Sequence, residues 1–209
     1  MKGSTHLAIG GATGLGVAMY LQTGPLTTIA LVGVGAVSGL APDLDINGKL
    51  SNRITVSKKW LHSFFAVMGV LLFGYSLFNL AGFEKWAGFI IGVALTVLPR
   101  IFIKQRTMLF ITGACIGWSG YEFELLWVML LSGFIMIASF LPHRSLTHSL
   151  IGAACFGVIA YQFEQSVQIE GSYAAGLLAY LSHLIADMKA LPSNRRGVKW
   201  FQPFFNKEF

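Results

Sequence analysis

Long apolar segments separated by short charged loops constrain this chain more than any other feature. Hydrophobic residues make up 55% of the 209 residues and charged residues only 11%, whereas a soluble domain carries roughly 25% charged residues. A chain of this size cannot bury so much apolar surface in one soluble core, so we expect lipid to be the solvent for most of it. Eight apolar segments can be drawn, to within a few residues: 6–22, 25–41, 60–80, 86–103, 107–120, 123–141, 147–163 and 172–188.

The lipid-facing segments must be helices, because lipid offers the backbone no hydrogen-bond partner. The predicted fold is therefore an all-α, polytopic transmembrane helical bundle of about eight segments. Several segments, 107–120 above all, are shorter than the roughly 20 residues that a perpendicular helix needs, so some are short or re-entrant. We expect a single membrane-embedded domain over residues 1–209. It ends in a short amphipathic tail, about 189–209, that can lie on the membrane surface.

The charges of the loops predict the topology. If the N-terminus and every second connection lie on one side, that side receives 14 of the 15 Lys and Arg residues. The other side keeps only Lys85, together with most of the glutamates. By the positive-inside rule the basic side is cytoplasmic, so we expect both termini in the cytoplasm. The basic residues sit in these loops and not in a separate basic domain, so we expect no nucleic-acid partner.

Glycines recur at a spacing of four residues in three of the segments. Gly10 with Gly14, Gly88 with Gly92, and Gly113 with Gly117 follow this spacing. Pairs of this kind let transmembrane helices approach closely. We therefore expect these three segments to pack tightly against neighbours.

The histidines and aspartates gather at one end of this predicted topology. Every aspartate and four of the five histidines fall on the basic side or within about a turn of it. They come from four separate parts of the chain, which helix packing could bring together. Ionisable groups in a membrane are costly and tend to be functional. The seven candidate metal ligands are His6, Asp43, Asp45, His143, His148, His183 and Asp187.

Their spacings suit metal ligation. Residues His183 and Asp187 lie four apart and so share one face of a helix. The carboxylates of Asp43 and Asp45 point the same way if the turn is extended. Ser145 or Thr147 can cap the next helix, which would place His148 in its first turn. Imidazole with carboxylate favours a divalent transition metal, zinc above all, with manganese or iron as alternatives. Seven ligands exceed one tetrahedral shell, so one or two ions could bind, or some residues could orient the others.

Two further kinds of residue have an alternative interpretation. Arg144, between two candidate ligands, could bind a phosphate with both prongs of its guanidinium or simply anchor a cytoplasmic loop. Arg195 and Arg196 face the same choice, with anchoring favoured. His62 has no partner motif, and we interpret it as an interfacial residue.

The motifs around these residues resemble those of a known family. The matching pieces are Thr5 and His6 with the glycines after them, 42–45, 143–149, 183–187, and 197–204 with its Gly197, Val198, Pro203 and Phe204. In this order they resemble the YdjM family of inner-membrane proteins, described as metal-dependent hydrolases. The resemblance implies that the seven ligand candidates form one site. It also implies a multi-pass protein of the bacterial inner membrane.

We therefore expect a membrane-embedded, metal-dependent hydrolase that cleaves a lipid or amphiphilic ester at the cytoplasmic face, with a phosphoester favoured. The metal would polarise the ester and lower the pKa of a water molecule. Asp43, Asp45 or Asp187 would accept the proton, and Arg144 would hold the phosphate. The expected partners are membrane lipids and a lipid-like phosphoester substrate.

Two other functions remain open. A metal-ion or proton transporter would also use intramembrane histidines and aspartates, although its path should have polar residues at mid-depth. A non-catalytic membrane protein with a structural metal would have a closed shell of four ligands, and seven candidates argue against it.

Overall fold

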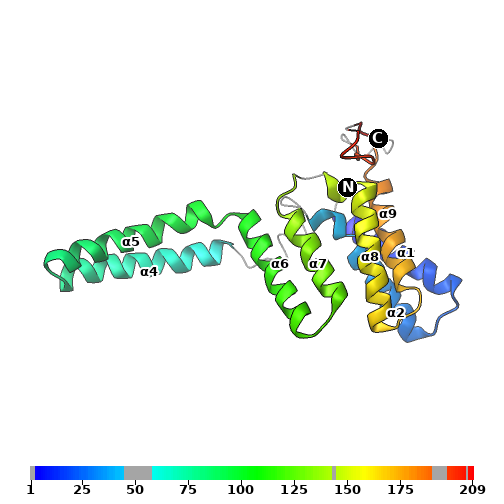
Figure 1. Cartoon of the computed structure of the whole chain (residues 1–209), viewed down its shortest axis with the longest axis horizontal. Helices are drawn as coiled ribbons and strands as arrows, with labels where there is room; N and C mark the ends of the chain where they lie inside the picture. The colour runs from blue at the N-terminus through cyan, green and yellow to red at the C-terminus, as the bar shows by residue number, and fades with distance from the viewer. Residues whose placement is uncertain (1–2, 45–57, 143–144, 190–196, 206) are drawn as a thin grey trace.

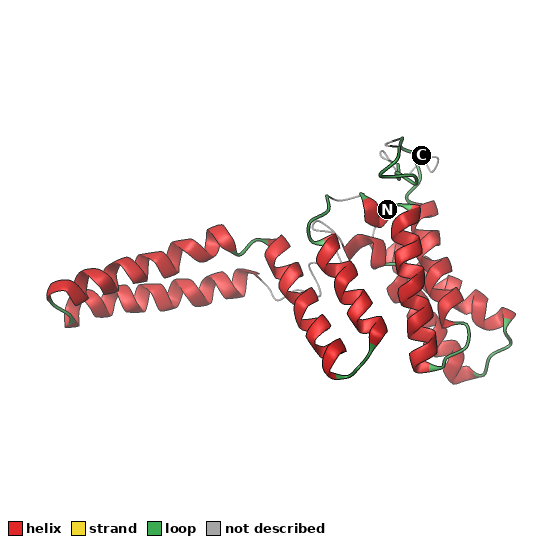
Figure 2. Ribbon diagram, in the orientation of Figure 1, coloured by secondary structure: helices red, strands yellow, loops and turns green. Residues whose placement is uncertain are grey.

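The computed structural model describes residues 3–44, 58–142, 145–189, 197–205 and 207–209. Within these residues all regular structure is helical, with no strand (Figure 2). Each of the eight predicted apolar segments corresponds to one α-helix. The helices are α1 (Gly3–Tyr20), α2 (Pro25–Ser38), α4 (Lys58–Asn79), α5 (Gly82–Phe102), α6 (Gln105–Glu122), α7 (Leu126–Ala138), α8 (Leu150–Val167) and α9 (Ser172–Ala186). Two short 3₁₀ turns, η1 (Ala41–Leu44) and η2 (Leu146–His148), follow α2 and precede α8.

Consecutive helices pair into hairpins whose seams are lined by the predicted glycines. Gly10 of α1 lies against the Gly35 carbonyl of α2, so that a Cβ there would meet backbone. A Cβ on Gly88 of α5 would lie 2.7 Å from the Cβ of Ser76 in α4. Gly113 of α6 is equally close to α7. The four-residue glycine spacing therefore marks the seams of the hairpins α1–α2, α4–α5 and α6–α7, as predicted.

Helix α9 lies at the centre of a six-helix bundle. It packs against α1, α2 and α8, while α7 packs on the far side of α8. Tyr180 and Leu184 of α9 are fully buried in the main core, which also contains Leu109 of α6. Because α9 is surrounded in this way, polar side chains near its C-terminal end are buried as well. This position is what brings the candidate site together.

The hairpin α4–α5 projects from this bundle and does not join it (Figure 1). Its helices, of 22 and 21 residues, are the two described helices that are long and apolar enough to cross a membrane. Outside their shared seam the surfaces are apolar and exposed, as Phe78 at 87% and Trp86 at 64% illustrate. At its base the His62 ring donates to the Ile103 carbonyl over 3.1 Å. The seam glycines of α4 and α5 pack against the other helix of the same hairpin. The bundle therefore contains the other six of the eight predicted segments.

The two chain ends lie at the same end of the six-helix bundle, where α8 begins and α9 ends (Figure 1). This is the end that receives the candidate histidines and aspartates. The side of the membrane to which this end belongs stays a prediction.

Candidate metal centre

Five of the predicted ligands converge at this end of the bundle. They come from α1, from both 3₁₀ turns and from the end of α9. Their ligand atoms form two overlapping groups, in each of which all atoms lie within 4.8 Å of one another. The first group contains His6, His183 and Asp187, and the second contains Asp43, His148 and His183. All but Asp43 are almost completely buried, and Asp43 retains 13% side-chain exposure.

His183 is oriented by a backbone carbonyl. Its Nδ1 lies 2.7 Å from the carbonyl oxygen of Gly39, at the end of α2. A carbonyl can only accept a hydrogen bond, so this nitrogen carries the proton and donates. The Nε2 atom of the neutral ring then has a lone pair and points into the cluster. Metal-binding histidines characteristically donate their other ring nitrogen in this way, which fixes both tautomer and ring orientation.

The spacing of the ligand atoms fits a metal shell. Nε2 of His183 lies 3.3 Å from Nε2 of His148, and Nε2 of His6 lies 3.3 Å from Oδ1 of Asp187. Two donors that each lie about 2.0–2.1 Å from zinc, at the tetrahedral angle, are about 3.3 Å apart. The remaining pairs that involve carboxylates are somewhat wider, at 3.7–3.9 Å. A divalent ion among these atoms therefore needs only small side-chain adjustments.

The two groups share a single nitrogen, which limits how many ions they can hold. His183 belongs to both groups, and its Nδ1 is already committed to Gly39. One Nε2 lone pair can bind one metal ion. An ion that binds Nε2 of His183 therefore completes one of the two groups of three described ligands, and not both.

Glycines set the distance between α1 and the end of α2. A Cβ on Gly39 would lie 2.8 Å from the carbonyl oxygen of His6. The close approach brings the His6 ring against that of His183, with centroids 3.8 Å apart and an angle of 23° between the planes. The helix seam thus positions both the candidate ligand His6 and the carbonyl that orients His183.

His148 is held by a different set of contacts. The hydroxyl of Tyr180, buried in α9, donates to the carbonyl of Thr147. The Thr147 hydroxyl lies 3.2 Å from Nδ1 of His148. Ser149 caps α8, because its side chain accepts from the Gly152 amide over 3.3 Å. These bonds fix the turn that carries His148 before the helix starts.

This arrangement corrects two predictions about local structure. The cap of α8 is Ser149 and not Ser145 or Thr147, so His148 lies in the turn before the helix and not in its first turn. Asp43 lies in a 3₁₀ turn and not in an extended one. One turn follows the packed helix α2 and the other precedes the packed helix α8, and a 3₁₀ turn satisfies the backbone there while the chain changes direction.

Asp187 and His183 meet as their spacing predicts. Asp187 follows the last turn of α9, and its amide donates to the His183 carbonyl over 3.0 Å. Its Oδ2 lies 3.8 Å from Nε2 of His183. The two candidate ligands, four positions apart, therefore share one face of the helix, and Asp187 faces His6 as well.

The electrostatics favour a charged carboxylate at Asp43. Burial raises the pKa of Asp43, but the His148 imidazole, 3.7 Å away, and the nearby His183 and His6 rings lower it by more. The net pKa of Asp43 lies below its ordinary value. The carboxylate is therefore ionised at neutral pH, as a metal ligand must be.

Three of the predicted site residues lie outside the described residues: Asp45, His143 and Arg144. Their roles stay predictions. Conversely, two contributors were not predicted from the sequence: Gly39 through its carbonyl and Tyr180 through its bond to the turn. Thr147 was predicted as a possible helix cap, whereas its hydroxyl lies beside Nδ1 of His148. Only the place of Gly39 just before the 42–45 motif could have indicated a close approach there.

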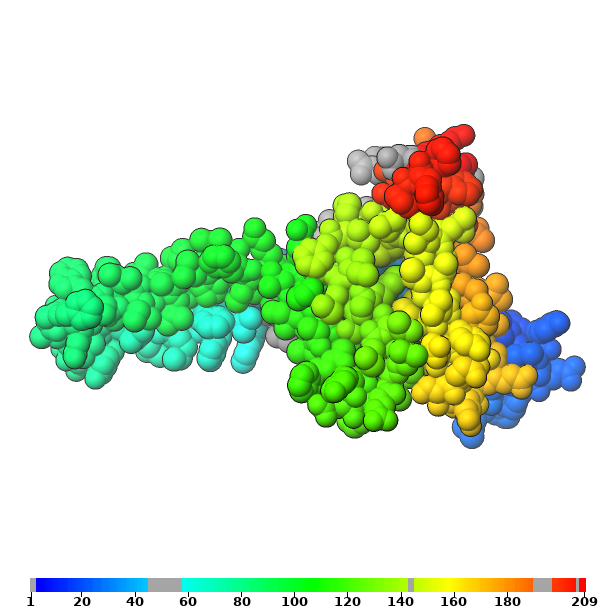
Figure 3. All heavy atoms as spheres, viewed as in Figure 1, coloured from blue at the N-terminus to red at the C-terminus, as the bar shows by residue number. Residues whose placement is uncertain are grey.

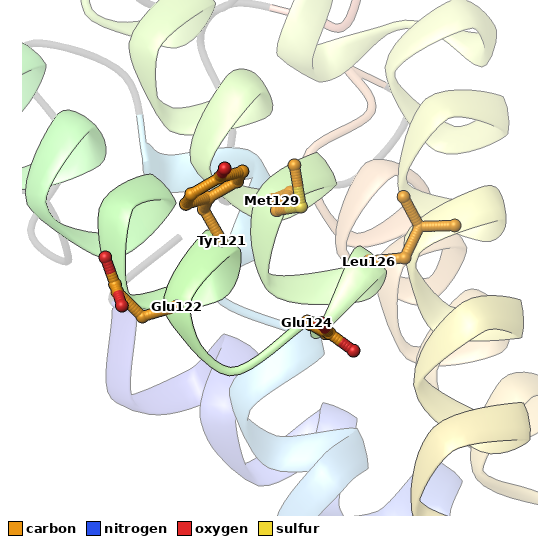
Figure 4. Close-up of a pocket in the computed structure, with 5 residues that line it drawn as sticks. All are labelled: Tyr121, Glu122, Glu124, Leu126 and Met129. Atoms are coloured by element: carbon orange, nitrogen blue, oxygen red, sulfur yellow. The ribbon is translucent and has the colours of Figure 1, made fainter.

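A concave region lies at the other end of the bundle. A shallow pocket at the turn between α6 and α7 is lined by Tyr121, Glu122, Glu124, Leu126 and Met129 (Figure 4). Figure 4 shows that the two carboxylates do not point toward one another. They therefore do not form a shared cation site, and the pocket is separate from the histidine cluster.

Comparison with known proteins identifies the family of the chain. No curated protein and no solved structure matches it. The family model described as YdjM inner membrane protein matches residues 1–209, which is the whole chain. The resemblance that the histidine and aspartate motifs indicated is thereby confirmed, and the chain belongs to the YdjM family of inner membrane proteins.

Proposed function

We propose that this protein is a membrane-embedded, metal-dependent hydrolase of a lipid or amphiphilic ester, with a phosphoester as the favoured substrate. The observation that carries the proposal is the convergence of three imidazoles and two carboxylates around Nε2 of His183. Buried imidazoles are seldom packed nitrogen to nitrogen at 3.3 Å without a shared proton or ion between them. A cation explains why the cluster includes both carboxylates and lone-pair nitrogens.

The donor set favours zinc, with manganese or iron as alternatives, because imidazole and carboxylate together suit these ions better than magnesium or calcium. One ion fits either group of three described ligands. A second would require Asp45 and His143 to add a separate set. A buried nitrogen of His6, Nδ1, has no partner among the described residues, which is consistent with further ligand or solvent contacts at the site.

The chemistry is divided among the chain's own residues. An ion bound here would polarise an ester oxygen and lower the pKa of a water molecule. Asp43, the partly exposed member of the cluster, is the side chain best placed to accept a proton from water that enters. Arg144 would hold the phosphate of the substrate with its two-pronged guanidinium. A substrate could arrive through the leaflet next to this end of the bundle.

A structural metal is the second candidate, and one observation favours it. Four of the five ligands are at most 3% exposed, and a closed, buried shell is typical of structural sites. The two functions differ in whether a ligand position is open to substrate.

An assay for hydrolysis of a lipid phosphoester by the purified protein in detergent–lipid micelles distinguishes the hydrolase from a protein with a structural metal. We expect turnover that stops with a chelator and returns with zinc or manganese. A protein that binds metal tightly yet cleaves no ester of any class would support the structural metal. If instead liposomes that contain the protein gain a metal-dependent ion flux without cleavage, the protein is a transporter.

A further inference from the structure

The described residues of the C-terminal segment, 197–205 and 207–209, fold back onto the end of the bundle that carries the histidine cluster. Figure 3 shows these residues, in red, as the part of the surface beyond the start of α8. The Leu150 amide, at the start of α8, donates to the Trp200 carbonyl over 2.9 Å. Phe209 closes the segment on itself, since it exchanges backbone hydrogen bonds with Val198 and accepts from the Lys189 amide. Val198 is fully buried in the main core.

The same segment presents three phenylalanines outward. Phe201 is 48% exposed, Phe204 77% and Phe205 69%. They occupy a single turn, because the amides of Phe204 and Phe205 both donate to the Phe201 carbonyl, over 2.9 and 3.1 Å. Three large apolar side chains are thus gathered on a segment that is itself firmly attached through its other face.

Basic residues surround these phenylalanines in the sequence. Between residues 189 and 209 the only acidic side chain is Glu208, against five basic ones: Lys189, Arg195, Arg196, Lys199 and Lys207. Among the described ones, Lys207 is exposed and Lys199 half-buried. Exposed aromatic rings with lysines beside them are the composition of segments that lie in a membrane interface and contact anionic headgroups.

We propose that the C-terminal segment is an interfacial anchor that docks on a bilayer surface containing anionic phospholipid. Phe201, Phe204 and Phe205 insert at the boundary between headgroups and acyl chains, and the lysines contact lipid phosphates. The position of the C-terminal segment in the molecule supports a lipid bilayer as the surface on which it docks. The chain belongs to an inner membrane family, and its helices α8 and α9 start and end beside this segment. If those helices cross the bilayer, the segment lies at interface depth.

The anchor is joined to the metal cluster through few bonds. Trp200 accepts from Leu150, two residues after His148, and Val198 packs in the same core as Leu44, the neighbour of Asp43. The segment is therefore attached to the bundle close to the turn that carries His148. This inference concerns a surface and does not rest on the metal or on hydrolysis.

Spin labels on the full-length protein in lipid nanodiscs test the anchor. Cys115 and Cys155 are replaced by serine, and single cysteines at Phe204→Cys or Glu208→Cys carry the label. We expect the label at 204 to collide more with oxygen and less with a water-soluble nickel chelate than the label at 208. The protection of the 204 label should be stronger in discs with phosphatidylglycerol than in discs of phosphatidylcholine alone.

Charge variants test the role of the lysines. Lys199→Gln together with Lys207→Gln should remove the difference between the two kinds of disc. Lys85→Gln, on the projecting hairpin, is the control and should preserve it. Equal nickel accessibility of the 204 and 208 labels would overturn the anchor. So would a protection of the 204 label that persists in detergent and coincides with dimers, because the phenylalanines would then cover a second copy of the chain.

Discussion

At the scale of single residues, the candidate site depends on side chains that hold the ligands as much as on the ligands. Tyr180 and Gly39 illustrate this. Neither belongs to the candidate ligands, yet one fixes the turn that carries His148 and the other orients His183. Such orienting partners typically change metal affinity by 10–100-fold when they are lost.

Tyr180→Phe should lower metal affinity while the fold persists. The variant loses the hydrogen bond to the Thr147 carbonyl, at a cost of about 0.5–1.5 kcal/mol, but keeps the ring that stacks on Phe156. Metal titration monitored by calorimetry should show weaker binding by roughly tenfold. Tyr161→Phe, whose residue is half exposed on α8, is the control. Unchanged affinity in Tyr180→Phe would show that the turn needs no such tether.

Arg144→Lys separates phosphate binding from loop anchoring. Lysine keeps the charge but not the two-pronged geometry, so turnover of a lipid phosphoester should fall about 10²–10³-fold. The metal content should stay the same, because neither residue is a ligand. Steady-state kinetics with elemental analysis of the same preparation measure both quantities. Full activity would return Arg144 to a role as a cytoplasmic anchor.

At the scale of elements, the seam between α1 and α2 determines whether His6 reaches the cluster. Gly35→Ala should push the two helices apart, because the new Cβ would lie 2.9 Å from the Gly14 amide nitrogen. Gly33→Ala, on the same helix, meets nothing within 4 Å and should be neutral or stabilising by up to about 1 kcal/mol. Thermal unfolding and metal content of both variants check this. A metal content that falls equally in both would show that the seam is not the cause.

The helices were predictable from the sequence because hydropathy reports directly on segments that need lipid or a core. Thus 6–22 corresponds to α1 and 172–188 to α9, within a few residues. The convergence of ligands followed from placing them at one end. The two 3₁₀ turns, the Ser149 cap and the Gly39 carbonyl were not predictable, because they depend on contacts between residues far apart in the chain. His183 and Gly39, for instance, are 144 positions apart.

At the scale of the whole molecule, the ends of the chain and the ligand cluster share one end of the bundle (Figure 1). The charge distribution predicts that this end is cytoplasmic. Reporter fusions at both termini and at residue 168, between α8 and α9, should give cytoplasmic signals at the termini and the opposite signal at 168. A C-terminus outside the cytoplasm would contradict this topology and place the cluster at the other face.

The projecting hairpin has consequences for how the protein sits in a membrane. Helices α4 and α5 are long enough to cross a bilayer, whereas α2, α7 and α9 have only 14, 13 and 15 residues. Short helices can pack inside a bundle where the longer ones face lipid. The candidate site lies in the six-helix bundle. The hairpin contributes exposed apolar side chains that can face lipid.

The metal content of the purified protein tests the central claim most directly. Elemental mass spectrometry of the intact protein should show about one equivalent of a divalent transition metal. Both groups of described candidate ligands need the same Nε2 atom of His183, which can bind one ion. The triple variant Asp43→Ala, His148→Ala and His183→Ala should lose it, while His62→Ala, at the base of the hairpin, should retain it. A folded triple variant that keeps the full complement of metal would contradict the account.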